Sequence, residues 1–505
     1  MKKQSLMIQG TASDAGKSFL VAGLCRYFAN QGIRVAPFKS QNMALNSAVT
    51  ADGAEIGRAQ ALQAEAAKTP ALSLMNPILL KPRDDMVSQL IVRGQAVGDV
   101  TPKEYQEFAL QEGHLIAANA FAELHQLYDL IILEGGGNPA EPNLAHYDIV
   151  NMGMARMVDA PVLLVSDIDR GGVFASLVGT LSLLEEADRP RVKGMVINRF
   201  RGDLDILQPG LEFLEKKTGL PVVGVLPYMT DIRLPEEDSL AARRRSAPRG
   251  EGLQIAVIRL PRISNFTDFD ALAASPGTDV FFAAHPDELR SADVVIIPGT
   301  RNSVQDLAWM REKGLDQTII TLHGHGVPIT GICGGYQMLG RLMHDPDGLE
   351  AAPGTTAGLG LLPCETVFRP GKTVQRATGA VLSQPWSKGA TLAGYEIHSG
   401  ETTVDDIKTV FARLTRSPGD VLVMDGCAAD DGLVFGTYLH GLFDDGSFRQ
   451  AYLTHIAELA TRRGRALPAI VMSAPEIDPL DQVAAMLEQN LDMELIQKII
   501  DQGNK

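Results

Sequence analysis

The chain has few cysteines, and none of them form a metal-binding or disulfide pattern. Four occur in 505 residues, far apart and without CxxC spacing, at Cys25, Cys333, Cys364 and Cys427. This spacing excludes a zinc site of the usual kind and a disulfide framework. The expected setting is therefore a reducing cytoplasm.

Long apolar runs and basic clusters are also missing. No stretch approaches the roughly 18 consecutive apolar residues of a membrane span, and the start MKKQSLMIQG has too short an apolar core for a signal peptide. The formal net charge is −15, and the one basic run, Arg243 to Arg245, is interpreted as a solvated linker. We expect neither a membrane nor a nucleic acid as partner.

The chain does contain a repeated alternation of short apolar runs with helix-like segments. Runs such as YDLIILEGGG and APVLLVSDID read as buried parallel strands, and segments such as SFLVAGLCRYFANQG read as the crossover helices. At about 150 residues per domain, the length allows two to four domains. The pattern predicts two doubly wound α/β domains, over residues 1–228 and 253–450, joined by a linker at 229–252 and followed by a helical C-terminal tail at 451–505 that packs as an appendage.

Residues 10–18, GTASDAGKS, lie between a predicted strand and a predicted helix, as a phosphate-binding loop does. Five residues separate Gly10 from Gly16, one more than in the Walker A pattern. Backbone N–H groups and a helix N-terminus bind phosphate in such a loop, and glycine permits the close approach. Lys17 is expected to reach the terminal phosphates of ATP, and Ser18 is expected to ligate Mg²⁺. The expected ATP-binding residues of the loop are Gly10, Thr11, Ala15, Gly16, Lys17 and Ser18.

Two carboxylates are candidates for the metal. Glu134 ends an apolar strand beside three glycines, where a carboxylate facing Mg²⁺ belongs, and Asp52 is the second candidate. The amide-rich stretch FKSQNMALNSAVTADGAEIGRAQ, which contains Asp52, suits a polar substrate carrying carboxylates and amides, with a solvated loop as the alternative.

A second chemical site is predicted around Cys333 in VPITGICGGYQMLG. Small residues on both sides of a nucleophile allow the sharp strand-to-helix turn that exposes it, and the N–H of Gly334 can serve in an oxyanion hole. The thiol needs a base. His440 in GLVFGTYLHGLFDD is the preferred candidate, and His398 in GYEIHSGET is the competing one.

The phosphate loop resembles the GTxTxxGKT loop of dethiobiotin synthetase and its relatives, in which five intervening residues are expected. These ATPases activate a carboxylate. Asn198 in VINRFRGD resembles their adenine-reading asparagine, with a simple strand-end turn as the alternative.

The Cys333 and His440 segments resemble the nucleophile and base of class I glutamine amidotransferases. In that fold the turn VVIIPGTRNS supplies further oxyanion-hole backbone, which implies Gly299 and Thr300 here. Most members carry Pro-Glu after the histidine, whereas this chain has Gly441-Leu442, so the third member of the triad is not assigned. The cobalamin-pathway branch also lacks that glutamate.

The two resemblances together point to the cobyrinic acid amidating enzymes. The motifs KSQNMALNS, EIGRAQ, EGGGNPAEPNL, SDIDRGGVFASLVGT, NRFRGD and PGTRNSVQDL match the branch that amidates the b, d, e and g carboxylates of adenosylcobyrinic acid a,c-diamide, using ATP with Mg²⁺ and glutamine as nitrogen donor. The branch that makes the a,c-diamide is the alternative. A partition-type ATPase is a further one, although such proteins carry an extra lysine early in the loop and Gly10 to Ala15 contains none. Ammonia is expected to travel a shared interior route between the two sites, and homo-oligomer formation is left open.

Overall fold

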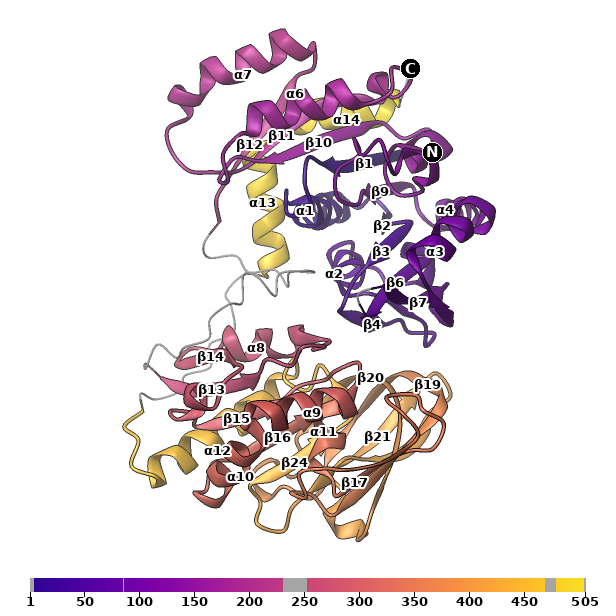
Figure 1. Cartoon of the computed structure of the whole chain (residues 1–505). Coiled ribbons are helices and arrows are strands. Elements are labelled where there is room, and N and C mark those ends of the chain that lie inside the picture. The colour runs from indigo at the N-terminus through magenta and orange to yellow at the C-terminus, as the bar shows by residue number, and fades with distance from the viewer. Residues whose placement is uncertain (1–3, 85, 230–251, 468–477, 504–505) are drawn as a thin grey trace. The chain divides into compact units, whose positions relative to one another are not determined.

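The chain folds into two compact units, seen in a computed structural model that describes residues 4–84, 86–229, 252–467 and 478–503 (Figure 1). Unit 1 comprises Met1–Ala44, Ala54–Pro235 and Pro475–Lys505, and unit 2 comprises Leu45–Gly53 and Glu236–Ala474. Nearly all of the expected linker 229–252, including the Arg243–Arg245 run, lies outside the described residues.

Unit 1 contains two sheets and nine α-helices among its described residues. Its strands are β1 (Gln4–Gly10), β2 (Val35–Phe38), β3 (Gln41–Met43), β5 (Glu55–Gly57), β6 (Ile78–Asp84), β7 (Val87–Val92), β8 (Gln95–Val100), β9 (Leu130–Glu134), β10 (Val162–Asp167), β11 (Val192–Phe200) and β12 (Val222–Pro227). Its helices are α1 (Lys17–Asn30), α2 (Arg58–Ala66), α3 (Pro102–Phe108), α4 (His114–Leu127), α5 (Met152–Val158), α6 (Val173–Leu183), α7 (Leu204–Thr218), α13 (Pro479–Asn490) and α14 (Met493–Gln502).

The main sheet of unit 1 is parallel, with the order β12-β11-β10-β1-β9-β2. Both faces are buried, which is why its strands read as continuous apolar runs. Along β1 the side chains alternate: Leu6 and Ile8 enter one apolar cluster, and Met7 enters the cluster on the other face. The chain runs from β1 to the β2 edge and later returns to the other side of β1. The carboxyl end of β1 therefore lies at the topological switch point, where α/β sheets bind ligands.

The two C-terminal helices complete one face of unit 1. Leu480 and Leu487 of α13 and Ile496 of α14 join the cluster that contains Leu24 of α1 (Figure 1). The helix contact is close because α1 has a glycine there: a Cβ on Gly23 would lie 2.4 Å from Leu487 Cδ1. Both helices are thus part of the unit 1 core.

Unit 2 also contains two sheets. Its strands are β4 (Ser47–Val49), β13 (Leu253–Ile258), β14 (Thr278–Ala283), β15 (Val294–Ile297), β16 (Ile329–Ile332), β17 (Leu342–Asp345), β18 (Gly354–Ala357), β19 (Cys364–Val381), β20 (Thr391–Val404), β21 (Ala412–Ser417), β22 (Val421–Asp425), β23 (Cys427–Ala428), β24 (Val434–Thr437) and β25 (Leu439–His440). Its helices are α8 (Asp270–Ala273), α9 (Ser303–Lys313), α10 (Leu315–Gly324), α11 (Gly334–Leu339) and α12 (Gly446–Arg462), with the 3₁₀ turn η5 at Phe266–Phe269.

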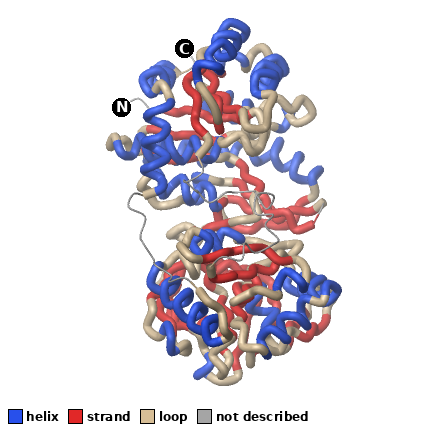
Figure 2. The backbone as a smooth tube through the Cα atoms, turned by 90° about the vertical axis from the view of Figure 1, so that its left-hand side faces the viewer, coloured by secondary structure: helices blue, strands red, loops and turns tan. Residues whose placement is uncertain are grey.

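The central sheet of unit 2 has the order β14-β13-β15-β16-β24-β23, parallel except for the β23–β24 pair. In each unit helices lie on both sides of the strands (Figure 2). The carboxyl ends of β13, β15 and β16 meet at one edge of the sheet, which brings the segments that follow them together. A second, mixed sheet contains β17 to β22 and β25.

A short segment from the N-terminal part of the sequence belongs to unit 2. Within Leu45–Gly53, Val49 packs with Tyr395 and Ile397 of β20. The expectation of two α/β domains with a helical C-terminal end is confirmed. Among the described residues, none of the helices combines the length and apolar character needed to cross a bilayer.

Candidate active sites

The predicted phosphate loop lies at the switch point of unit 1, between β1 and α1. Gly10 is the last residue of β1, and Thr11 continues along β10: its N–H donates to Val165 O at 3.0 Å and its hydroxyl pairs with Ser166 Oγ at 2.7 Å. Ala15 is fully buried. The two contacts of Thr11 fix the start of the loop to β10.

Gly16 and Asn198 form the base of the loop. Gly16 has φ +99°, and a Cβ there would lie 2.0 Å from Asn198 Nδ2, so a side chain does not fit. Asn198 Nδ2 donates to Ala15 O at 3.0 Å. In this structure Asn198 therefore braces the loop through its carboxamide, at the end of β11.

Lys17 and Ser18 begin α1 and point to different partners. Lys17 Nζ donates to the carbonyls of Ala12 at 2.8 Å, Ser13 at 3.1 Å and Gly137 at 3.2 Å. Ser18 Oγ donates to Glu134 Oε1 at 2.8 Å. The structure thus brings together the loop lysine, the loop serine and the glycine-rich turn after β9.

Glu134 is the centre of a buried polar network. Its side chain is 1% exposed, and it accepts from Lys39 Nζ at 2.9 Å and from Gln63 Nε2 at 2.5 Å. Burial alone raises the pKa of a carboxyl group, but the charge and hydrogen bond of Lys39, the hydrogen bond of Gln63 and the charge of Lys17 outweigh it and lower the pKa of Glu134. Glu134 is therefore ionised near neutral pH.

The donor set at this position fits Mg²⁺. A serine hydroxyl and one carboxylate are hard oxygen ligands, and Mg²⁺ takes one or two such protein ligands together with waters and phosphate oxygens. No group of three or more His, Cys, Asp or Glu side chains suited to a metal occurs in the part of the chain that the structure describes. Asp52, the second candidate, is exposed, belongs to unit 2 and accepts a hydrogen bond from Thr50 Oγ1.

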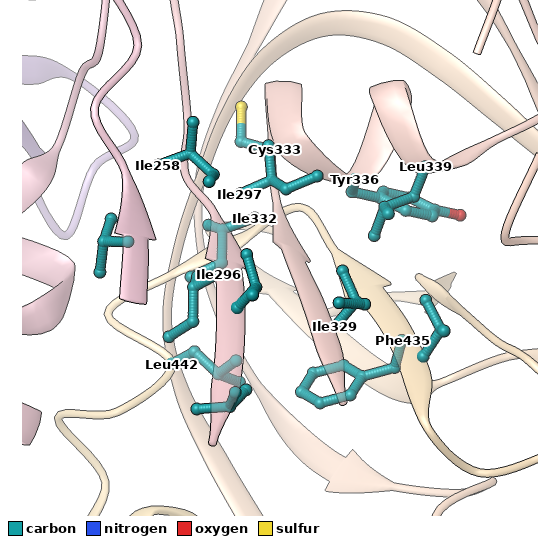
Figure 3. Packing of buried hydrophobic residues seen from close by; sticks show 14 of the residues in the cluster. Ile258, Ile296, Ile297, Ile329, Ile332, Cys333, Tyr336, Leu339, Phe435 and Leu442 are labelled. Carbon is teal, nitrogen blue, oxygen red and sulfur yellow. The ribbon is translucent and has the colours of Figure 1, made fainter. Parts of the chain in front are cut away.

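Cys333 occupies a sharp turn between β16 and α11. Its backbone has φ 52° and ψ −109°, a strained conformation for a residue with a side chain. The flanking glycines permit the turn: a Cβ on Gly331 would lie 2.5 Å from Leu339 Cδ1, and one on Gly335 would lie 2.0 Å from Ile297 O. Figure 3 shows the sulfur pointing away from the packed apolar side chains below it. Sγ lies 3.5 Å from Ile397 O.

His440 is paired with an aspartate that the sequence did not reveal. His440 Nδ1 lies 2.7 Å from Asp268 Oδ2, and Asp268 Oδ1 accepts from Gly441 N at 3.0 Å. Burial alone lowers the pKa of an imidazole, but the charge and hydrogen bond of Asp268, together with Cys333, raise the pKa of His440 to about 10. Asp268 thus holds the His440 ring through Nδ1, whereas Gly441-Leu442 supply no carboxylate.

The predicted oxyanion-hole residues lie beside the nucleophile. A Cβ on Gly299 would lie 2.9 Å from His440 Cε1 and 3.6 Å from Cys333 Cβ, and one on Gly334 would lie 3.2 Å from Thr300 N. Gly299 is therefore adjacent to Cys333, and Gly334 is adjacent to Thr300. The Thr300 hydroxyl donates to Asp306 Oδ2 at 2.5 Å, which fixes the turn.

His398, the competing base, has other partners. Its Nδ1 lies 2.8 Å from Gly400 O, its Nε2 lies 3.6 Å from Glu396 Oε1, and its ring stacks on Tyr438 at 3.7 Å between centroids. Glu396 in turn pairs with Arg416 at 2.6 Å. The geometry favours His440 as the partner of Cys333.

Sequence reasoning missed four residues of these sites: Lys39, Gln63, Asn265 and Asp268. Lys39 and Gln63 lie in or next to the amide-rich stretch, whose density of polar residues was the available signal. Asn265 Nδ2 lies 3.3 Å from His440 Nε2. Asp268 and Asn265 sit in NFTDFD, which has no distinguishing pattern.

Two family models match the chain. Residues 6–241 match the CobQ/CobB/MinD/ParA nucleotide binding domain, and residues 254–448 match the CobB/CobQ-like glutamine amidotransferase domain. The first contains the phosphate loop and Glu134. The second contains Cys333, Asp268 and His440.

The similarity to curated proteins extends over the whole chain. The chain is 46% identical to cobyric acid synthase of Citrobacter koseri and 43% identical to that of Desulforamulus reducens, covering 99% of this chain in both comparisons and 99% and 98% of those proteins. It is also 46% identical to the protein of the same name from Sorangium cellulosum, with 99% of each chain covered.

Solved structures match part of the chain at low similarity. A crystal structure of a glutamine amidotransferase covers 40% of this chain at 18% identity with a TM-score of 0.30, and PurLQS from Thermotoga maritima covers 41% at 19% identity with a TM-score of 0.32.

Proposed function

Because the chain belongs to the cobyric acid synthase family, we propose that it amidates the b, d, e and g carboxylates of adenosylcobyrinic acid a,c-diamide, with ATP and glutamine as co-substrates. The observation that carries the proposal is the presence in one chain of two complementary sites. One is the Cys333–His440–Asp268 arrangement, and the other is the phosphate loop with Glu134. A reducing cytoplasm suits the four free, buried cysteines.

The glutaminase half begins with a proton transfer. His440, oriented by Asp268, takes the proton of the Cys333 thiol, and the sulfur attacks the side-chain amide carbon of glutamine. The backbone N–H groups of Gly334 and Thr300 stabilise the negative oxygen of the tetrahedral intermediate. His440 returns the proton to the leaving nitrogen, and ammonia departs. Water then hydrolyses the thioester and releases glutamate.

The synthetase half makes the carboxylate reactive. The γ-phosphoryl group of ATP passes to a corrinoid carboxylate oxygen, giving an acyl phosphate and ADP. Ammonia attacks the acyl carbon, and phosphate leaves with the C–O bond. Lys17 of the phosphate loop stabilises charge on the transferred group. Ser18 and Glu134 would hold Mg²⁺, which supplies neutralisation of phosphate charge when bound.

The test measures amidation of the a,c-diamide by mass spectrometry, with glutamine or ammonium as the nitrogen source. We expect ATP-dependent conversion of four carboxylates, and no conversion when cobyrinic acid itself is supplied as the control for the other branch. Cys333→Ala is expected to lose the glutamine reaction and keep the ammonium reaction. Glutamine use by that variant would overturn the assignment of the nucleophile.

A further inference from the structure

The oxyanion-hole turn that follows β15 is bonded to the segment that follows β13. Arg301 N donates to Arg262 O at 3.2 Å, and Ser264 N donates to Gly299 O at 2.9 Å. The same segment continues to Asp268. This pairing therefore connects the oxyanion hole with the segment that carries the aspartate bonded to His440.

The backbone N–H of Thr300 takes no part in this pairing. Ile263 and Thr300 form the antiparallel bridge that lies between the two bonds. In such a pair the two residues exchange no backbone hydrogen bond, so their N–H groups point away from the opposite strand. Within the residues that the structure describes, the Thr300 N–H has no hydrogen-bond acceptor, and Thr300 N lies 3.2 Å from the point that a Cβ on Gly334 would occupy. The N–H is therefore available to the oxyanion of an intermediate on Cys333.

The carboxylate of Asp306 holds this turn against Arg262. Asp306 is completely buried in the first turn of α9. Its Oδ2 accepts from Thr300 Oγ1 at 2.5 Å and from Arg262 N at 3.2 Å, and its Oδ1 accepts from Arg262 Nη1 at 3.2 Å. Burial raises the pKa of Asp306, and these hydrogen bonds oppose the rise without cancelling it. One carboxylate thus gathers three donors from the turn and from the segment after β13.

Gly299 explains why the turn needs such a restraint. A Cβ on Gly299 would lie 2.9 Å from His440 Cε1, so the imidazole leaves no room for a side chain. Glycine has the widest backbone freedom of all residues, and the peptide that joins it to Thr300 carries the oxyanion-hole N–H. The Thr300 hydroxyl belongs to the same residue as that N–H. Anchoring the hydroxyl on Asp306 therefore limits rotation of the peptide and keeps the N–H in place.

Capping of α9 does not account for these contacts. A carboxylate in the first turn of a helix interacts favourably with the helix dipole, and Asp306 has that position. The cap itself is Asn302, whose side chain accepts from Gln305 N at 2.8 Å. All three bonds that the Asp306 oxygens accept come from residues outside α9. The carboxylate is thus directed at the oxyanion-hole turn and not at the backbone of its own helix.

We propose that Asp306 is a positioning residue of the glutaminase reaction, which holds the N–H of Thr300 where the oxyanion forms. The inference rests on the proposed function, since it takes glutamine as the substrate of Cys333. It divides the site into two parts. Cys333 and His440 determine the reactivity of the sulfur, whereas stabilisation of the tetrahedral intermediate depends on Asp306 through Thr300.

The experiment compares two reactions of Cys333 in the full-length chain. Glutamine hydrolysis passes through an oxyanion. Alkylation by iodoacetamide does not, because the sulfur displaces iodide from a CH₂ group and forms a C–S bond, and its rate at Cys333 is read by peptide mass spectrometry. In Asp306→Asn the NH₂ group must face one of the three donors, and a misplacement of about 1 Å costs about 100-fold in rate. We therefore expect kcat for glutamine to fall by about 10- to 100-fold, with KM and the alkylation rate near their wild-type values.

Thr300→Val tests the same contact from its other side, and Asp316→Asn is the matched control. The valine keeps the N–H and removes the hydroxyl, so kcat should fall as in Asp306→Asn, and this variant gives the same readings if Asp306→Asn does not fold. Because both changes break one contact, the double variant should lose no more than the larger single effect, whereas independent effects would multiply. Asp316 is also buried in the first turn of a helix, α10, and Asp316→Asn should keep the wild-type kcat. Circular dichroism and ammonium-dependent amidation by each preparation report folding.

The outcomes separate this inference from the proposed function. A folded Asp306→Asn protein with the wild-type kcat for glutamine would overturn the inference. An equal fall in kcat and in the alkylation rate would also overturn it, because the whole site would then be disturbed, and so would losses that multiply in the double variant. Glutamine hydrolysis that does not change in Cys333→Ala would instead overturn the proposed function. A fall in kcat alone, shared by Thr300→Val and absent from Asp316→Asn, supports the positioning role.

Discussion

Replacing Asp268 with asparagine removes one charge from the glutaminase site and preserves the shape of the side chain. In the native chain Oδ1 accepts from Gly441 N and Oδ2 accepts from His440 Nδ1. In Asp268→Asn the carboxamide oxygen is needed by the Gly441 N–H, so the NH₂ group faces Nδ1. The imidazole must then carry its proton on Nε2, the nitrogen that should accept the thiol proton of Cys333.

The size of the effect follows from these two losses. A hydrogen bond to a charged group contributes about 1.5–3 kcal/mol, which corresponds to a factor of roughly 10 to 150 in rate. The wrong tautomer adds to this loss, and the equivalent change in a Ser-His-Asp triad lowers kcat by about 10⁴. We therefore expect kcat for glutamine to fall by about 10²- to 10⁴-fold in Asp268→Asn.

The assay measures glutamate release together with ammonium-dependent amidation by the same protein. The ammonium reaction should stay within about twofold, because it does not use Cys333 or His440. Asp293→Asn is the matched control: Asp293 is also buried, but it accepts from Gln254 N and pairs with Arg465, away from His440. A kcat for glutamine within tenfold of wild type in Asp268→Asn would refute the assignment of the third triad member.

Other predictions test the remaining parts of the molecule. Glu134→Gln should lower ATP-dependent amidation by about 100-fold or more with either nitrogen donor. Normal amidation by this variant with ammonium would contradict the role of Glu134 as a ligand of Mg²⁺. Leu487→Ala should lower the free energy of unfolding by about 2–5 kcal/mol in urea, and an unchanged midpoint would mean that α13 adds nothing to the core. Arg416 and His398 overcome the effect of burial and lower the pKa of Glu396 to about 2, so Glu396→Gln should cost about 3 kcal/mol above pH 4.5, a difference that shrinks as pH falls from 4.5 to about 2. With ¹⁵N-glutamine and unlabelled ammonium together, the amides should carry mainly ¹⁵N; equal competition from ammonium would exclude a protected ammonia route.

The candidate site residues that could be predicted from the sequence are those that lie in short continuous motifs. GTASDAGKS and GICGG each place glycines next to a reactive side chain between a strand and a helix, so local sterics suffice to recognise them. Asp268 gave no such signal. It reaches His440 because the segments that follow β13 and β24 leave the same carboxyl edge of the sheet, a proximity that depends on the sheet topology and not on local composition.

The fold class could be predicted for the same reason, since apolar runs and helical periodicity are local. The partner of each amphipathic helix could not, because an apolar stripe does not specify which core receives it. The segments Pro479–Asn490 and Met493–Gln502 read as helices, but their packing on α1 follows from the tertiary structure. Likewise, the position of Leu45–Gly53 in unit 2 follows from Asn265 and Tyr395, more than 200 residues away.

The packing of α13 and α14 on α1 has a consequence for dissecting this protein. The nucleotide-binding half is assembled from both extremities of the polypeptide, so a fragment that stops after β12 would expose the apolar surface that Leu480, Leu487 and Ile496 normally cover. Cutting the gene between the two matched families would yield an aggregation-prone N-terminal piece. A separately expressed nucleotide-binding half would need the last thirty or so residues fused to its C-terminus. In sequence, the amidotransferase half is therefore inserted into the nucleotide-binding half and does not simply follow it.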